Sequence, residues 1–352
     1  MRLGRVVKGF AVLLLLAGLA AASVAQLVWT RLQTPYKGYG AAEQFVDIPR
    51  GVGTSGVGVR LAEAGVVRDA WLVRLAVWWT GSGRALKAGE YRFDHAMTPI
   101  DVVGVLARGE VYEHRITFPE GLTIAEMAAL YEMHGFGRAA DFTEASHDAS
   151  LVADLDSRAP DLEGYLFPET YALPRTATAA QLVHQMVDRF KMVFGPALRQ
   201  QAAAQGLSLR QVVTLASVIE KETASADERP LVSAVYRNRL AQGMALQADP
   251  TVVYALARVH RYDGNIHRAD LQLDSPYNTY RYPGLPPGPI ASPGQASLEA
   301  ALAPADVRYV YFVSRNDGTH AFATTLAEHN ANVRKFQVEF FRQRRLAARA
   351  AR

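Results

Sequence analysis

One apolar segment near the N-terminus limits what this 352-residue chain can be. Residues 9–29 contain only two clearly polar side chains, Ser23 and Gln26. The segment is preceded by three basic residues, Arg2, Arg5 and Lys8. A helix of about 20 apolar residues spans a bilayer, and its basic flank stays in the cytoplasm. The sequence therefore predicts a cytoplasmic N-terminus at 1–8, a membrane anchor at 9–29 and an exported remainder.

A cleaved signal peptide is the alternative for this segment, because small residues at 23–25 resemble a cleavage site.

Composition excludes several other classes of protein. The chain has no cysteine, which excludes disulfide scaffolds and thiolate metal sites, and its net charge of +4 gives little support to nucleic-acid binding. The nine histidines lack metal-ligand spacing, and GVGTSG at 51–56 is not followed by βαβ units. We therefore expect no metal and no cofactor.

The segment after a linker at 30–42 reads as strand–turn–helix units. FVDIPRG predicts a strand and a turn, VGVRLAEAGVV predicts a helix, and RITFPEGLTIAEM repeats that plan with Thr123 and Glu126 as a capping box. Between them, LKAGEYRF predicts a strand and MTPIDVVGVLARGE a helix capped by Thr98. We expect residues 43–137 to form one or two small α+β modules.

A boundary is expected at 138–160, where large apolar residues become sparse. The second domain, at 161–340, mixes helices with loops rich in Pro and Gly, and 341–352 is a basic tail. The predicted fold class is α+β: an N-terminal transmembrane helix, the small modules, then a mixed α+β domain. The long loop SPYNTYRYPGLPPGPIASPG at 275–294 indicates function, because structureless loops of that length are uncommon inside a domain.

The most informative helix contains LASVIEKETA, residues 215–224, and starts at a capping box of Ser208 and Gln211. At 100° per residue, Glu220 falls roughly 40° from the centre of the apolar stripe, whereas Glu222 falls about 120° away. We expect Glu220 to be half-buried and Glu222 to face water. A carboxyl in apolar surroundings has a raised pKa, as a general acid requires.

A buried ion pair is the structural alternative for Glu220, with Arg237 or Arg239 of the next predicted helix as its partner. Nearby segments favour a polar cleft. MALQADPTVVYAL places Gln247 before a helix that we expect Asp249 to cap. The 275–294 loop adds aromatic and amide side chains of the kind that line sugar sites.

Several segments in this order closely resemble the endolytic murein transglycosylases, the MltG or YceG-like family. These segments are LEGYLFPETY, ASVIEKETA, ERPLVSAVYRNRL, LQADPTVVYAL, SPYNTYRYPGLPPGPI and DGTHAFATTLAEHNANV. The resemblance covers about residues 43–340, with a LysM-like region before the catalytic domain. It implies a single-pass protein of the bacterial inner (plasma) membrane, with its catalytic domain in the periplasm or outside the cell.

The implied activity is cleavage of the MurNAc–GlcNAc β-1,4 bond in nascent peptidoglycan, leaving 1,6-anhydro-MurNAc ends and terminating glycan elongation. The family's catalytic Glu lies in EKET and carries over to Glu220, which would act as the single acid and base. Glycan strands are the implied substrate and peptidoglycan synthases are implied partners. The candidate substrate-binding residues are Glu163, Tyr165, Glu169, Gln247, Asn278, Thr279 and Tyr280.

Two other functions stay open at this point. A two-carboxylate muramidase needs Glu163, Glu169 or Asp249 within roughly 5–10 Å of Glu220. A non-enzymatic wall-binding protein would instead bury Glu220 against Arg237 or Arg239. The muramidase is distinguished by its reaction products. The wall-binding protein is distinguished by a Glu220 carboxylate that is closed off from solvent by an arginine.

Overall fold

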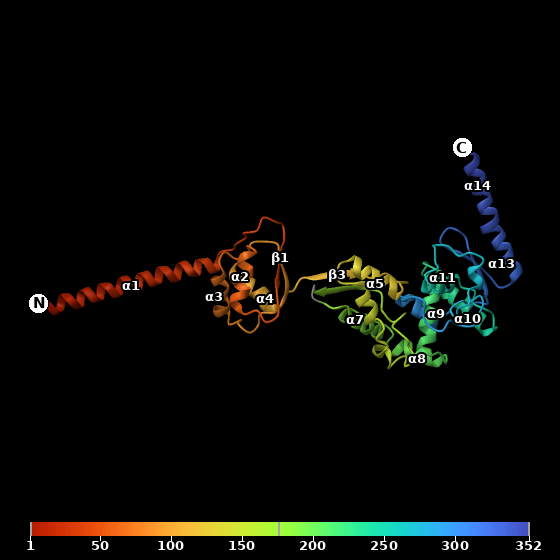
Figure 1. Ribbon diagram of the computed structural model, residues 1–352, viewed down its shortest axis with the longest axis horizontal. Coiled ribbons are helices and arrows are strands. Elements are labelled where there is room, and N and C mark those ends of the chain that lie inside the picture. The colour runs from red at the N-terminus through yellow and green to blue at the C-terminus, as the bar shows by residue number, and fades with distance from the viewer. Residues whose placement is uncertain (1, 175–176, 351–352) are drawn as a thin grey trace. The chain divides into compact units, whose positions relative to one another are not determined.

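The computed structural model describes residues 2–174 and 177–350 (Figure 1). Packing divides this part of the chain into two compact units. Unit 1 holds residues 2–115 and 172–174, and unit 2 holds 116–171 and 177–350. Three two-stranded sheets accompany many helices, so the described chain is α+β and mostly helical, as predicted.

Unit 1 begins with one long apolar helix, α1 (Arg2–Gln33). The stretch Val12–Gln33 is long and apolar enough to cross a membrane, and its most apolar 18 residues are not buried. The last turn of α1 differs from the rest, because Leu32 is buried and Val28 packs against the core of unit 1. The predicted apolar segment is thus one helix whose C-terminal end belongs to a folded unit.

The rest of unit 1 is built around a strand–helix–helix–strand motif. It contains β1 (Gln44–Ile48), α2 (Thr54–Glu63), α3 (Ala70–Thr80), β2 (Gly89–Phe93) and α4 (Pro99–Arg108). β1 pairs antiparallel with β2, placing Val46 opposite Tyr91. The predicted strands and the Thr98 cap of α4 are confirmed, since the Thr98 side chain accepts a bond from the Asp101 amide. Alternate strand residues and one face of each helix form the core.

β3 (Glu113–Thr117) and β4 (Thr170–Pro174) form the second sheet, and the division between the units passes through both strands. Unit 2 then contains α5 (Ile124–Met133), α6 (Ala139–Ala145), a 3-10 turn (Ala149–Val152), α7 (Ala179–Val193), α8 (Pro196–Ala204), α9 (Leu209–Glu222), α10 (Arg229–Ala241), α11 (Asp249–Arg258), a 3-10 turn (Asp270–Gln272) and α12 (Gln295–Leu302). It ends with β5 (Tyr311–Ser314), β6 (His320–Ala323), α13 (Leu326–Val333), a π-helical stretch (Arg334–Glu339) and α14 (Phe340–Ala350).

The division at residue 115 differs from the expected boundary at 138–160. Residues 116–137 pack in unit 2 rather than with the first module, and the expected linker contains α6. Phe142 of α6 is fully buried, with its ring centroid 5.9 Å from that of Phe118 and 5.4 Å from that of Tyr131. One large aromatic residue anchors a segment that average composition describes as sparse in apolar residues.

Candidate active site

The helix α9 is the centre of unit 2. Its capping box is confirmed, because Ser208 accepts a bond from the Gln211 amide and Gln211 accepts one from the Ser208 amide. Every residue from Val212 to Ile219 is buried. α9 packs against α8, α10, α11 and α12 (Figure 1). The helix therefore has no solvent face along its middle, and both glutamates at its C-terminal end meet protein.

Glu220 is held by two donors. Its Oε1 accepts a bond from Arg229 Nη2 at 3.2 Å, and its Oε2 accepts one from the Gly294 amide at 3.0 Å. The side chain is only 6% exposed. Burial is as predicted, but the surroundings are a cation and an N–H group rather than apolar atoms.

The expected ion-pair partners of Glu220 were wrong. Arg237 donates to the side chain of Gln205, and Arg239 donates to the carbonyls of Leu246 and Val310. The partner is instead Arg229, at the first position of α10. Only six residues lie between Glu222 and Arg229, so the intervening turn brings this arginine, and not the later ones, back to the end of α9.

A second carboxylate joins this ion pair from a distant part of the chain. Glu120 Oε2 lies 3.6 Å from Arg229 Nη2. Burial and the charge of Glu220 raise the pKa of Glu120, while Arg229 lowers it. The Glu120 loop is held by paired backbone bonds, from the Gly121 amide to the Ser292 carbonyl and from the Ser292 amide to the Leu122 carbonyl. Glu120 was not predicted as a site residue, because its neighbours in the sequence indicate only a turn.

Glu222 has the environment that was expected of Glu220. Its Oε2 atom is buried and has no partner with full hydrogen-bond geometry. Burial is the main cause that raises the pKa of Glu222 to about 7, and the Asp249 carboxylate raises it further, whereas Tyr236 and Arg239 lower it. The expectation that Glu222 faces water was wrong, because an isolated helical wheel assumes one packed face.

Four of the predicted substrate-binding residues come together on two loops. The Gln247 amide donates to the Thr279 carbonyl, and Gln247 has a positive φ of 49°. Thr279 and Asn278 are buried and hold the loops: Asn278 Nδ2 donates to the carbonyls of residues 271 and 273. Tyr280 donates to Asp249 Oδ1 at 2.6 Å. Gln247 is exposed and Tyr280 half-buried, so these two remain accessible beside Asp249.

The role expected of Asp249 differs from the one observed. The N-cap of α11 is Ala248, and Asp249 is the first helical residue. Its carboxylate accepts the Tyr280 hydroxyl instead of a backbone amide. The charge of Asp249 raises the pKa of Glu222.

The other three predicted residues contact different partners. Glu163 is buried and accepts bonds from the Ile124 amide at 3.1 Å and the Tyr254 hydroxyl at 3.3 Å. The buried Tyr165 donates to Asp156 at 2.7 Å, and Glu169 pairs with Arg189 at 2.6 Å. None of these contacts includes Glu220 or Glu222, and each is a sufficient structural reason for its residue.

Glu163 predicts a pH dependence of stability. Burial raises the pKa of Glu163 to about 8 from 4.5. A carboxyl whose pKa is raised by folding stabilises the native state below its unfolded pKa, and this contribution is lost as the pH rises. We expect the free energy of unfolding to fall between pH 5 and 8 by on the order of 1 kcal/mol per pH unit.

Denaturant unfolding at several pH values measures this decline. The Glu163→Gln variant should show a much shallower decline between pH 7 and 8, where the contribution of Glu222 fades as the pH rises above its pKa of about 7. Glu169→Gln, at an exposed ion pair, is the matched control and should keep the wild-type slope. An unchanged slope in Glu163→Gln would contradict the assignment.

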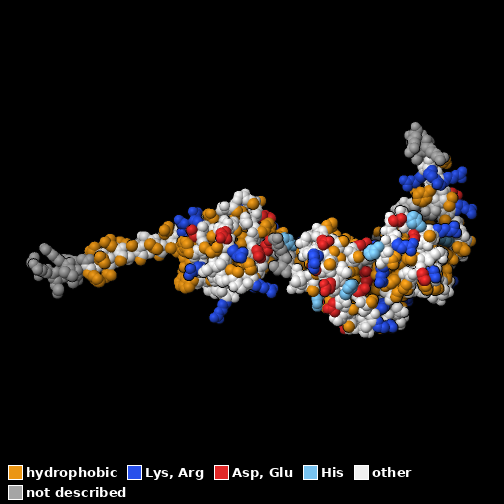
Figure 2. Space-filling model, in the orientation of Figure 1, with side chains coloured by type: hydrophobic (Ala, Val, Ile, Leu, Met, Phe, Trp, Pro, Cys, Tyr) orange, Lys and Arg blue, Asp and Glu red, His pale blue; other side chains and the backbone are white. Residues whose placement is uncertain are grey.

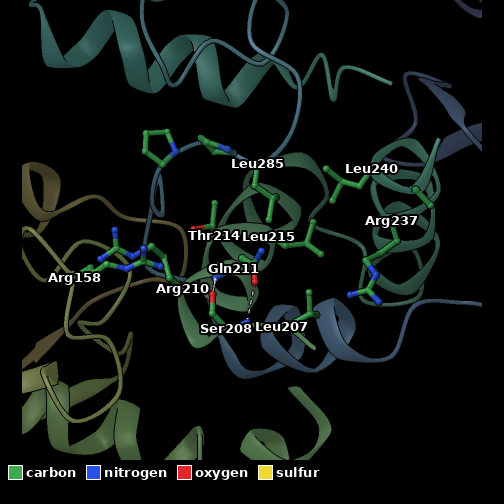
Figure 3. A pocket seen from close by; sticks show the side chains of 13 residues that line it. Arg158, Leu207, Ser208, Arg210, Gln211, Thr214, Leu215, Arg237, Leu240 and Leu285 are labelled. Carbon is green, nitrogen blue, oxygen red and sulfur yellow. Dashed lines mark hydrogen bonds between the residues drawn. The ribbon is translucent and has the colours of Figure 1, made fainter. Parts of the chain in front are cut away.

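A cavity of about 730 Å³ lies at the other end of α9 (Figure 3). Its lining includes Ser208, Gln211 and Thr214 of this helical segment together with Arg158, Arg210 and Arg237. It contains none of the predicted site residues. Its lining extends along this segment to Leu215, which precedes Glu220 by five residues, or about 8 Å along a helix. Neither Glu220 nor Glu222 lines the cavity.

Comparisons with known proteins all match one protein family. The model of the YceG-like family matches residues 46–335. The chain is 29% identical over 306 residues to the endolytic murein transglycosylase of Bacillus subtilis, covering 83% of this chain and 84% of that one. It is 28% identical over 320 residues to the endolytic murein transglycosylase of Streptococcus pneumoniae serotype 2, covering 82% of this chain and 57% of that longer relative.

A solved structure supports the same match. The crystal structure of a YceG-like protein from Listeria monocytogenes aligns with a TM-score of 0.57 and 32% sequence identity, covering 82% of this chain and 98% of that one. The similarity therefore includes the fold as well as the sequence.

Proposed function

Because the chain belongs to the YceG-like family, we propose that it is an endolytic lytic transglycosylase that cleaves the MurNAc–GlcNAc β-1,4 bond of peptidoglycan and leaves 1,6-anhydro-MurNAc ends. One observation of the site carries the proposal. The C-terminal end of α9 presents a buried carboxyl group with a pKa of about 7, beside Asp249 and the accessible loop residues Gln247 and Tyr280. A group with that pKa can donate and accept a proton near neutral pH.

The geometry supports Glu222 better than Glu220 as this acid and base. Each carboxyl oxygen of Glu220 already accepts a bond from within the protein, from Arg229 or from the Gly294 amide, whereas Oε2 of Glu222 has no such partner. Burial of Glu222 favours its neutral form. We therefore assign the proton transfers to Glu222. Glu220 acts as a positioning residue, since its two contacts fix the end of α9 on α10 and on the loop before α12.

The proposed reaction needs no water. Glu222 gives its proton to the glycosidic oxygen, the bond from that oxygen to C1 of MurNAc breaks, and the GlcNAc 4-hydroxyl leaves. The MurNAc 6-hydroxyl oxygen then forms the new bond to C1, and its proton returns to Glu222. Because the nucleophile is part of the substrate, its proximity replaces an activated water.

The muramidase alternative now involves a different pair. Glu163 and Glu169 are occupied elsewhere, whereas the charge of Asp249 acts on Glu222. A hydrolase would use Glu222 as the acid and Asp249 as the second carboxylate.

The chemical nature of the product ends decides between these reactions. The full-length protein in detergent is incubated with uncrosslinked glycan strands, and the new ends are identified by mass spectrometry. We expect 1,6-anhydro-MurNAc ends. Reducing MurNAc ends would show hydrolysis, and no cleavage of glycan would favour the wall-binding alternative, in which the Glu220–Arg229 pair is purely structural.

The remaining proposals follow from family membership. We propose that α1 is an uncleaved single-pass anchor with the N-terminus in the cytoplasm and unit 2 outside it. The β1–α2–α3–β2 motif of unit 1 is proposed as a LysM-like module, and unit 2 as the catalytic domain. We propose that cleavage of nascent strands terminates their elongation and that peptidoglycan synthases are partners of the protein.

A further inference from the structure

All four tryptophans of the chain lie in unit 1, on α1 and α3. They are exposed: Trp29 by 39%, Trp71 by 45%, Trp78 by 74% and Trp79 by 55%. Trp is usually well buried, so an exposed set on adjacent helices indicates an interaction surface.

The tryptophans of α3 form one face of that helix. Trp71 and Trp78 are seven positions apart and Trp71 and Trp79 eight, so they follow the helical repeat. The opposite face carries the buried residues Leu72, Val73, Ala76 and Val77. α3 is therefore packed into unit 1 on one side and shows apolar rings on the other. We call this exposed face the tryptophan face.

Direct contacts hold the tryptophan face at the C-terminal end of α1. The rings of Trp29 and Trp79 meet edge to face with centroids 4.9 Å apart. Arg31 lies 3.8 Å from Asp69, the N-cap of α3. Leu32 of α1 is buried in the core that α3 also forms. The end of the apolar helix and the tryptophan face thus belong to the same packed unit.

We propose that the tryptophan face lies in the interface between headgroups and acyl chains of the bilayer that α1 spans. This inference rests on the proposed anchor. Hydrophobic side chains occur along the part of α1 that is coloured in Figure 2, and the stretch long and apolar enough to span a membrane ends at Gln33, four residues after Trp29. Trp is enriched at this depth because its ring is amphipathic.

The charge of Arg74 also favours lipid as the partner of the tryptophan face. Arg74 is exposed on α3 between Trp71 and Trp78, where it can reach lipid phosphates while the rings enter the apolar boundary. Aromatic rings also stack on sugars, so a glycan strand is the competing occupant. Continuity with the membrane-spanning helix favours lipid. The consequence is that unit 1 lies against the membrane surface and is not suspended above it.

Tryptophan fluorescence reads this surface without a label, since the chain has no other tryptophan. The full-length Trp29→Phe variant, which keeps the three tryptophans of α3, is reconstituted in vesicles whose lipids carry bromine near the headgroups. We expect a roughly twofold loss of emission relative to unbrominated vesicles, together with protection from aqueous acrylamide. Exposed Trp→Phe changes should leave the melting temperature unchanged.

The matched control is the triple variant Trp71→Phe, Trp78→Phe and Trp79→Phe, which keeps only Trp29. If brominated lipid quenches this control but not Trp29→Phe, the tryptophan face is not in the bilayer while the anchor stands. If neither is quenched, the anchor itself fails and the inference fails with it. Emission of Trp29→Phe that responds to glycan strands and not to brominated lipid would make the face a glycan platform and overturn the proposal.

Discussion

Replacing Glu222 by Gln should lower the rate of glycan cleavage by about 10³-fold, since a positioned general acid and base contributes about 10²–10⁴-fold. Gln has nearly the same size and shape but can neither give the proton to the glycosidic oxygen nor accept it from the 6-hydroxyl. The measurement is the steady-state release of anhydro-MurNAc ends from uncrosslinked strands. Stability should rise or stay constant, because a buried carboxyl group with a raised pKa is removed.

Glu220→Gln is the matched control on the same helix. We expect it to cleave within about tenfold of the wild type, because it changes a side chain that holds the end of α9 and not the group that we assign as the proton donor. The pH profile separates the two residues further. If Glu222 must be protonated, kcat/KM falls as the pH rises above about 7, the pKa of that group. Loss of cleavage in Glu220→Gln with activity kept in Glu222→Gln would return the catalytic role to Glu220.

Local structure was predictable from local sequence. The capping boxes at Thr123 and Ser208 and the strands of the first module formed where the residues indicated, because each depends on groups a few positions apart. The amphipathic pattern also located α9 and its burial. These features need no knowledge of the tertiary fold.

The electrostatics of the site was not predictable in this way. Arg229 and the Gly294 amide donate to Glu220, and Glu120 pairs with Arg229, so three separate segments meet there. The periodicity of these segments does not indicate the meeting. Glu222 was placed in water because the wheel treats a helix as having one packed face, whereas α9 is surrounded by four helices. The choice between two glutamates two positions apart therefore depends on tertiary contacts that a single helix does not encode.

Replacing Gly164 by Ala should destabilise unit 2 by about 3 kcal/mol. Gly164 has a φ of +84°, a region that costs other residues about 1–2 kcal/mol. An added Cβ would also lie 2.4 Å from Pro289 Cβ and 3.0 Å from Val213 Cγ1. Neither neighbour yields easily, because the proline ring is rigid and Val213 is buried in α9, so overpacking adds about 1–3 kcal/mol.

The backbone at Pro289 connects this clash to the site. The next residue, Ile290, donates its amide to Ser217 Oγ of α9 at 3.0 Å, and the same segment ends at Gly294, the donor to Glu220.

Thermal unfolding followed by circular dichroism should show a fall in Tm of roughly 6–12 °C for Gly164→Ala. Gly206→Ala is the matched control, because Gly206 has a φ of +65° and no atom within 4 Å of an added Cβ. The free energy of unfolding of Gly206→Ala should fall only by the cost of the left-handed backbone conformation, about 1–2 kcal/mol. Equal losses in the two variants would mean that residues 285–294 do not pack against α9 as described, and the position of the Gly294 amide at Glu220 would then lose its support.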